Sequence, residues 1–308
     1  MLSFVIILFC LFSFKLTVSE RRTVIVNKPD EYQGLGSYFC FSFIAYIYFT
    51  SHKLPALLNE KDFAFTRQSG KFWSAYFENP IWIDVHSHPF PNKREIHFYP
   101  FLHFFMSKEQ NNPDKVLSEI FYNTSTSSDN LNKNIDIIKT YMSTFWKLKP
   151  GIIEDFNFKK NYELELDGKE YVSIVLREGD KKTLEPHLKS TNITHLINYI
   201  ISIKINYIHL ITDSYNAYLL LKSYIPSYMH IITTVKPNKP HGFYLKTALR
   251  TWSEIQRDQE VLETLFNYEL CRQAKVTLMD ATTNIGVWAN LLRVSDGTLY
   301  HFINQEEE

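Results

Sequence analysis

The residues best suited to chemistry stand directly after a run of β-prone residues. The stretch from Tyr171 to Leu176 predicts a buried strand, and it leads into a turn that contains Arg177, Asp180 and Lys181. Open α/β sheets hold phosphorylated ligands at such strand ends, and an arginine there can form a bidentate pair with a phosphate. The aspartate would fix the loop. Many strands of α/β proteins end on charged residues without binding a ligand, so other segments must support this interpretation.

A second candidate for anion binding lies near the N-terminus. The run from Thr23 to Val26 predicts a short strand, Gly34 and Gly36 form a turn, and residues Ser37 to Thr50 predict a buried helix. Unpaired backbone N–H groups at a helix N-terminus attract anions. Gly34 and Gly36 are therefore candidate ligand-binding residues, and a plain tight turn is the alternative.

Composition excludes one class of function. The chain has 308 residues, with 33 basic and 33 acidic side chains. Nucleic-acid binding needs a clustered positive surface, so no nucleic-acid partner is expected. The content of 24 Phe and 19 Tyr with only 9 Gly indicates a tightly packed globular protein. The length suffices for two domains of ordinary size.

The first 22 residues predict a targeting segment. Leu2 to Phe14 is an apolar run of signal-peptide length that is too short to span a bilayer comfortably. A cleaved signal peptide and a short membrane anchor both stay open, because Leu16 to Val18 could extend the run. Either form indicates the secretory pathway, in the ER or Golgi lumen. There, Asn123 and Asn192 would be glycosylation sequons.

Few residues are available for covalent or metal cross-links. Beyond the leader the cysteines are Cys40 and Cys271. They allow one disulfide at most, and two separate buried thiols are the alternative. No Cys/His framework would complete a zinc shell around His86 and His88, so we expect no metal site.

Strand and helix patterns alternate from about residue 160. The predicted strands are 171–176, 207–212, 229–235 and 275–279, and the predicted helices are 191–203, 216–224, 257–272 and 285–292. Such alternation implies parallel strands joined by crossover helices. The sequence therefore predicts a Rossmann-like domain over residues 160–308, after an N-terminal α/β lobe over residues 23–159.

Several segments, in order, resemble the alpha-1,6-fucosyltransferase family, with nodulation fucosyltransferases and protein O-fucosyltransferases as more distant relatives. They are the glycine turn before Cys40, the aromatic stretch 65–77, the helical pattern before Pro150, and the strand ends at Asp213 and 276–284. The diagnostic element of the family is a strand followed by His-x-Arg-Arg-x-Asp-Lys. This pattern falls on Val175 to Lys181. The resemblance covers about residues 34–292.

The resemblance implies a two-lobed GT-B fold and transfer of fucose from GDP-fucose to a glycan or glycoprotein acceptor, with inversion and without a metal ion. By position, Arg177 would hold the pyrophosphate and stabilise the leaving GDP. Lys181 would support the site, and Glu185 would act as the base for the acceptor hydroxyl. The nucleotide pocket would be lined by Asp213, Thr282, Thr283 and Asn284. From the residues alone, Glu185 is equally a surface carboxylate, and Asp213 and Thr282-Thr283 are equally helix caps.

Departures from the family pattern leave a second function open. The family's histidine is Val175 here, and its second arginine is Glu178, which brings an anion next to two phosphates. An aspartate that the family pattern leads us to expect near the pocket falls on Asn267. A degenerate, noncatalytic member that binds a glycan or protein partner is therefore the alternative function. A transferase that uses another nucleotide sugar is a third.

Overall fold

The computed structural model describes residues 24–28, 34–51, 57–60, 63–65, 72–78, 83–84, 93–97, 139–176, 193–238, 250–279, 283–295 and 299–302. The predicted targeting segment, the sequon asparagines Asn123 and Asn192, the His86 and His88 pair and the polar stretch 108–134 lie outside these ranges. Within the ranges, no helix combines the length and the apolar character that crossing a membrane requires.

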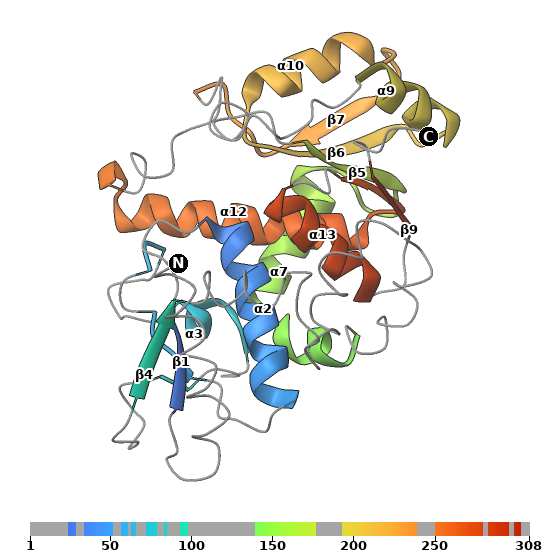
Figure 1. Cartoon of the computed structure of the whole chain (residues 1–308). Coiled ribbons are helices and arrows are strands. Elements are labelled where there is room, and N and C mark those ends of the chain that lie inside the picture. Colours follow the sequence, from blue (N-terminus) through green and yellow to red (C-terminus); the bar gives the residue numbers. More distant parts are fainter. Residues whose placement is uncertain are drawn as a thin grey trace, which may run out of the picture.

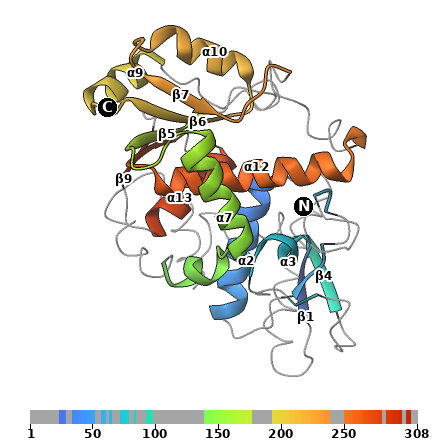
Figure 2. The same ribbon diagram turned by 180° about the vertical axis from the view of Figure 1, so that it is seen from behind.

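The chain forms two parallel sheets (Figures 1 and 2). The N-terminal sheet has the order β3-β2-β1-β4, and the C-terminal sheet has the order β7-β6-β5-β8-β9. The strands of the first are β1 (Val24–Lys28), β2 (Leu57–Leu58), β3 (Ile83–Asp84) and β4 (Lys93–His97). Those of the second are β5 (Tyr171–Leu176), β6 (Tyr207–Thr212), β7 (His230–Thr233), β8 (Val276–Met279) and β9 (Leu299–Phe302). These two parallel sheets with their helices confirm the predicted α/β class.

Strand β5 lies at the centre of the C-terminal sheet, and all six of its residues are buried. Successive side chains of a strand point to opposite faces, so one strand supplies two cores. Val172, Ile174 and Leu176 belong to the core beneath the outer helices, whereas Tyr171 and Val175 belong to the larger core on the other face. This accounts for the nearly continuous apolar run in the sequence.

Helices cover both faces of this sheet (Figure 1). The outer face carries α9 (Ile193–Ser202) and α10 (Tyr215–Tyr224), and the inner face carries α12 (Glu254–Gln273) and α13 (Asn284–Ser295). The four predicted helices are therefore confirmed, with shifted ends. Helix α12 begins earlier than expected because Ser253 and Gln256 form a capping box there.

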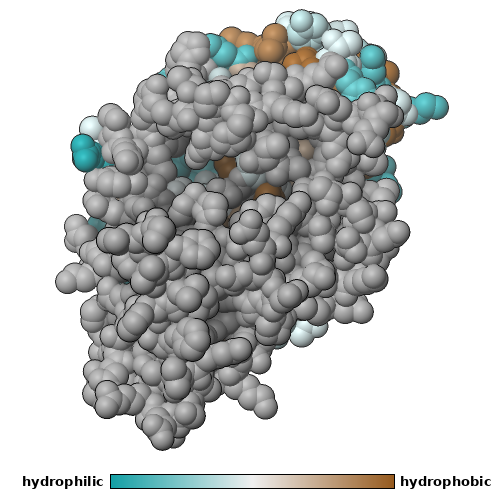
Figure 3. Space-filling model, in the orientation of Figure 1, coloured by the Kyte–Doolittle hydropathy of each residue, from teal (hydrophilic) through white to brown (hydrophobic). Residues whose placement is uncertain are grey.

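Few side chains of the outer helix α10 are buried. Helix α10 contributes only Ala217 and Leu221 to the core. Its Leu219 and Leu220 are 47% and 44% exposed. Hydrophobic side chains are visible at this end of the molecule among the described residues in Figure 3.

A core rich in aromatic side chains joins α2 (Leu35–Ser51) to the inner helices. Phe39 of α2 is fully buried, stacks on Trp288 of α13 and packs edge-on against Trp146. The predicted aromatic loop and short helix are also confirmed: α3 (Trp73–Tyr76) follows the buried Phe63, Phe65 and Phe72. Many of the described Phe and Tyr side chains thus lie in one shared core.

The structure decides between the two alternatives for the cysteines and shows the role of Pro150. Cys40 and Cys271 are separate buried thiols, so the disulfide alternative is wrong and the buried-thiol alternative holds. The helical pattern before Pro150 is confirmed by helical residues up to 145, and Pro150 itself begins α7 (Pro150–Phe158), which continues into the π-helical segment η3 (Lys159–Glu163). Proline is compatible with the first helical position, since the N–H it lacks would have no partner there.

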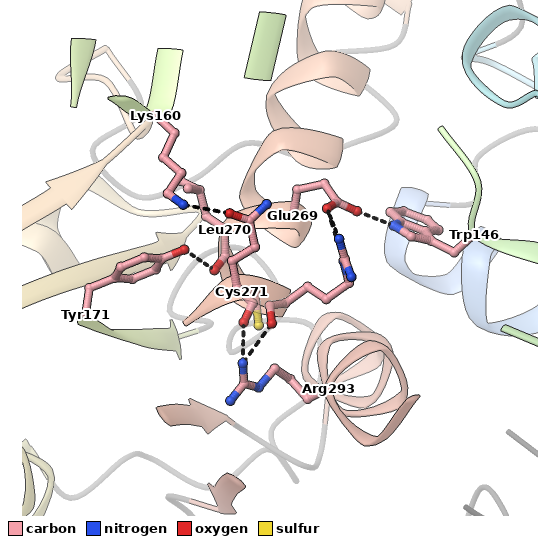
Figure 4. A network of polar contacts seen from close by, with 9 residues as sticks. Trp146, Lys160, Tyr171, Glu269, Leu270, Cys271 and Arg293 are labelled. Carbon is pink, nitrogen blue, oxygen red and sulfur yellow. Dashed lines mark hydrogen bonds and ion pairs between the residues drawn. The ribbon is translucent and has the colours of Figure 1, made fainter. Parts of the chain in front are cut away.

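The buried guanidinium of Arg293, from α13, forms hydrogen bonds at the C-terminal end of α12 (Figure 4). Its Nη1 donates to the carbonyl oxygens of Cys271, Arg272 and Ala274, and its Nη2 donates to that of Lys275 at 3.3 Å. The last carbonyls of a helix lack intrahelical partners and carry partial negative charge. One cation therefore binds two of the last carbonyls of α12 and two carbonyls of the turn into β8.

Candidate functional site

A cleft of about 110 Å³ opens at the carboxyl ends of β5, β6 and β7. Helix α12 forms its wall, and the first turn of α13 adds Ile285. The lining residues are Val175, Leu176, Ile211, Thr212, Asp213, Thr234, Val235, Glu260, Glu263, Thr264, Asn267, Tyr268 and Ile285. Ligands of open α/β sheets bind at this edge of the strands.

The register of the two central strands brings the predicted site segments together. Leu176, the last residue of β5, is paired with Thr212, the last residue of β6. In the sequence, Arg177 follows the first and Asp213 follows the second. Parallel neighbours thus bring two distant segments to one edge. Arg177 itself lies outside the described residues, as do Asp180, Lys181, Glu185 and Thr282.

Asp213 is a lining residue of the cleft. The residue that caps α10 is its neighbour Ser214, whose hydroxyl accepts from the N–H of Ala217 at 3.4 Å. The hydroxyl of Thr212 accepts from the N–H of Ser214 at 3.2 Å. The structure therefore places the helix-capping role, the alternative for Asp213, on Ser214.

Thr283 and Asn284 stand at the start of α13. Thr283 is 7% exposed, and its hydroxyl accepts from the N–H of Gly286 at 3.2 Å, as a capping side chain does. Asn284 is the first residue of the helix and precedes Ile285, which lines the cleft. The capping alternative for Thr283 therefore holds, and the first turn of α13 borders the cleft.

The first turn of α2 packs on that of α13. A Cβ added to Gly36 would lie 3.0 Å from Cγ1 and 3.2 Å from the backbone nitrogen of Ile285, and 3.2 Å from the hydroxyl oxygen of Tyr268. Both neighbours line the cleft. Gly34 precedes the helix, and its carbonyl accepts from the N–H of Tyr38 at 2.9 Å. The glycine turn thus brings the positive ends of two helices together beside the cleft.

Replacing Gly36 by valine should lower the free energy of unfolding by about 1–3 kcal/mol, because no space exists for the added methyl groups. Gly151, in α7, is the matched control, since a Cβ there would meet no atom within 4 Å. Gly151→Val should stay within about 0.5 kcal/mol of the parent. Urea unfolding of both variants measures the difference. Equal stabilities would contradict the close approach of α2 and α13.

A row of polar side chains runs from the buried sheet to the partly exposed cleft. Ser173 and His209 are fully buried, and their Oγ and Nδ1 atoms are 3.0 Å apart. His209 Nε2 lies 3.1 Å from Oδ1 of Asn267, whose Nδ2 donates to the hydroxyl of Thr234 at 2.8 Å. Sequence reasoning did not identify His209. The available signal was polar residues at the inward positions of two strands that otherwise read as apolar.

Burial lowers the pKa of His209 from its ordinary value of 6.5 to about 4, against a smaller opposing effect of the bond to Asn267. Between these values the unfolded chain binds a proton that the native protein does not. Above about pH 6.5, His209 is neutral in both states and does not make the free energy of unfolding depend on pH. As the pH falls from there towards 4, that free energy decreases by up to about 1.4 kcal/mol per pH unit.

The variant His209→Gln, which cannot titrate, should show a shallower loss of stability over this range in denaturant unfolding. The difference between the two proteins isolates His209 from the carboxyl groups that titrate in the same range. An identical pH dependence would contradict the lowered pKa.

The described lining of the cleft is acidic. Asp213, Glu260 and Glu263 are its charged members, and Glu263 accepts from Nζ of Lys236 at 3.0 Å. Carboxylates of this kind accept hydrogen bonds from ligand hydroxyl and N–H groups. A phosphorylated ligand would need cations from outside the described lining. Across the described residues, no group of His, Cys, Asp and Glu is placed to hold a metal ion.

The chain matches no protein-family model and no curated protein. Its structure is similar to that of NodZ alpha-1,6-fucosyltransferase soaked with GDP-fucose, at 11% identity and a TM-score of 0.48, covering 88% of this chain and 93% of that one. For the fucosyltransferase NodZ from Bradyrhizobium the values are 11%, 0.47, 87% and 92%. For POFUT1 in complex with GDP-fucose they are 8%, 0.49, 94% and 99%. At these identities and TM-scores the similarity assigns no activity to this chain.

Proposed function

We propose that the chain is a glycosyltransferase that moves fucose from GDP-fucose to a hydroxyl of a glycan-type acceptor, with inversion and without a metal ion. One observation carries the proposal: the cleft lies where β5 and β6 end, next in sequence to Arg177 and with Asp213 in its wall. The ordered motifs that resemble alpha-1,6-fucosyltransferases point to the same edge of the sheet.

In this reaction Glu185 takes the proton of the acceptor hydroxyl, and the acceptor oxygen forms a bond to the anomeric carbon of fucose. The bond from that carbon to the phosphate oxygen breaks, and GDP leaves with the electron pair. Arg177 offsets the charge that builds on the pyrophosphate, and Lys181 supports it. A base must reach the hydroxyl that it deprotonates, so Glu185 has to approach the acceptor in the donor complex.

In the proposal, the cleft binds the nucleoside of the donor, and the N-termini of two helices bind its phosphates. The carboxylate of Asp213 suits donor groups of the nucleotide, such as ribose hydroxyls or base N–H groups. The N-terminal turns of α2 and α13, at Gly36 and Ile285, suit the phosphates. Asp180, Thr282 and Asn284 belong to the same proposed nucleotide site, together with Gly34. Thr283 acts there through the start of α13.

The organisation of the whole chain belongs to the same proposal. Residues 1–22 would target the chain to the ER or Golgi lumen, as a signal peptide or short anchor. Residues 23–159 would form the acceptor lobe, and residues 160–308 would form the donor-nucleotide lobe.

A thermal-shift titration with GDP, GDP-fucose and UDP, in the presence of a chelator, tests the donor site. A ligand that binds only the folded state raises the melting temperature, by an amount that grows with its concentration over its Kd. We expect GDP and GDP-fucose to raise it and UDP to leave it unchanged. A shift with UDP alone would indicate another nucleotide sugar.

A noncatalytic glycan- or protein-binding role is the second candidate. The acidic lining of the cleft and Glu178 favour it, because carboxylates oppose the binding of two phosphates. If no nucleotide raises the melting temperature, this second function replaces the first. A glycan-array screen of the secreted protein would then identify its partner.

A further inference from the structure

We propose that His209 is a positioning residue of the cleft: it sets the direction of a chain of hydrogen bonds that ends on Thr234, so that this hydroxyl presents its hydrogen to the ligand. The chain runs from Ser173 through His209 and Asn267 to Thr234. The inference deepens the proposed function, on which it rests for the choice of GDP as the probe.

The direction follows from the capacity of each group. Neutral imidazole has one N–H donor and one acceptor nitrogen. His209 Nε2 faces the amide oxygen of Asn267, which only accepts, so Nε2 carries the hydrogen. Nδ1 is then the acceptor, and the hydroxyl of Ser173 donates to it. A buried histidine of lowered pKa keeps this single hydrogen at neutral pH.

The same reasoning continues to the cleft. With its oxygen held by His209, the amide of Asn267 turns its nitrogen to Thr234 and donates to that hydroxyl at 2.8 Å. The Thr234 oxygen is then an acceptor within the chain, and its own hydrogen must point elsewhere. Asn267 and Thr234 both line the cleft, so the chain ends where a ligand would lie.

This arrangement makes a prediction about ligand chemistry. Thr234 and the second N–H of Asn267 are donors, and they require a ligand group that accepts, such as a carbonyl oxygen or ring nitrogen of a nucleobase. Asp213 lines the same cleft and accepts. A buried polar row costs free energy unless all its members are satisfied, and apolar side chains of similar shape would serve stability equally well. Stability alone therefore does not account for the row, whereas orienting the hydroxyl of Thr234 at the cleft does.

Two measurements on the full chain test the proposal. The first needs no ligand: long-range ¹H–¹⁵N spectra of ¹⁵N-histidine-labelled protein identify the tautomer, and loss of the signal in His209→Gln assigns it. We expect the Nε2–H tautomer, unchanged between about pH 5.5 and 8 because the pKa is low. The Nδ1–H tautomer, or a titration near the ordinary value, would overturn the proposal.

The second measurement is the dissociation constant of GDP by calorimetry. Thr234→Val and His209→Leu should each weaken binding about tenfold, the loss of one hydrogen bond. His209→Gln should restore most of the affinity, because its amide N–H can stand near the place of Nε2–H. Thr140→Val, at an exposed position outside the cleft, is the matched control and should leave GDP binding unchanged.

Coupling separates positioning from general damage to the fold. The double variant His209→Leu/Thr234→Val should bind GDP no more weakly than either single variant, because both changes break one chain. Additive losses would contradict the proposal, as would unaltered affinity in His209→Leu. If His209→Leu fails to fold, Ser173→Ala removes the donor to Nδ1 and should shift the tautomer. If the parent protein binds no GDP, the proposed function fails, and the tautomer still decides the role of His209.

Discussion

Replacing Arg177 by alanine should lower kcat/KM for GDP-fucose about 100-fold to 1,000-fold, the usual loss when one preorganised donor to a developing negative charge is removed. The residue directly follows Leu176, which ends β5 and lines the cleft. In the proposed function, a cation here would offset the acidic side chains of the cleft and the charge on the departing GDP. The measurement is the initial rate of GDP release at several GDP-fucose concentrations, with a glycan as the acceptor.

Variants of the same segment separate this role from a general effect of charge. Lys182→Ala removes a neighbouring cation and should change kcat/KM less than about threefold. Arg177→Lys keeps the charge but loses the bidentate geometry, so it should recover only part of the activity. Glu178→Arg should strengthen GDP binding, since it removes an anion beside the phosphates. Full activity in Arg177→Ala would refute the assigned role.

Replacing Arg293 by alanine should lower the free energy of unfolding by about 3–5 kcal/mol, for two reasons that add. The side chain is wholly buried, so its removal leaves a cavity. Its guanidinium also donates to four backbone carbonyls at the junction of α12 and β8, and these would lose a charged donor. Guanidinium chloride unfolding, with the m value compared between proteins, measures the change.

Lys275→Ala is the matched control at the same junction. The Lys275 side chain is 59% exposed, and its Nζ pairs with the exposed Glu170 at 3.0 Å. Exposed pairs contribute little, so this variant should stay within about 0.5–1 kcal/mol of the parent. If both variants lost a similar free energy of unfolding, the hydrogen bonds from Arg293 to the end of α12 would contribute no more than an exposed ion pair.

The C-terminal lobe could be predicted closely because its segments carry local signals. The bounds of β5 and β6 agree with the prediction, since a run of β-prone residues bounded by turn residues indicates a buried strand. The helix after β6 was predicted within one residue of α10 for a similar reason. The strands β3, β4 and β9 were not predicted, because strands of this kind depend on their neighbours for pairing.

Some residues of the candidate site could be predicted from the sequence, and others were found only in the structure. The strand ends before Arg177 and Asp213 could be read from the sequence, since both follow directly from the strand pattern. The resemblance placed Asn267 near the pocket, and it lines the cleft. The part of Thr234 and Tyr268 could not be read from the sequence, because they are far apart along the chain and meet only when α12 packs on the sheet. A helical pattern shows which residues share a face, but it does not show what that face contacts.

By itself, the sequence determined the α/β class, the order of the main strands and helices of the C-terminal lobe, and the strand ends that carry the candidate site. Periodicity and turn chemistry are local properties, and they suffice for these features. Only the tertiary structure decided that Cys40 and Cys271 stay apart, that Ser214 rather than Asp213 caps α10, and that His209 leads to the cleft. These outcomes depend on which buried surfaces pack together, and packing brings into contact residues that no local pattern relates.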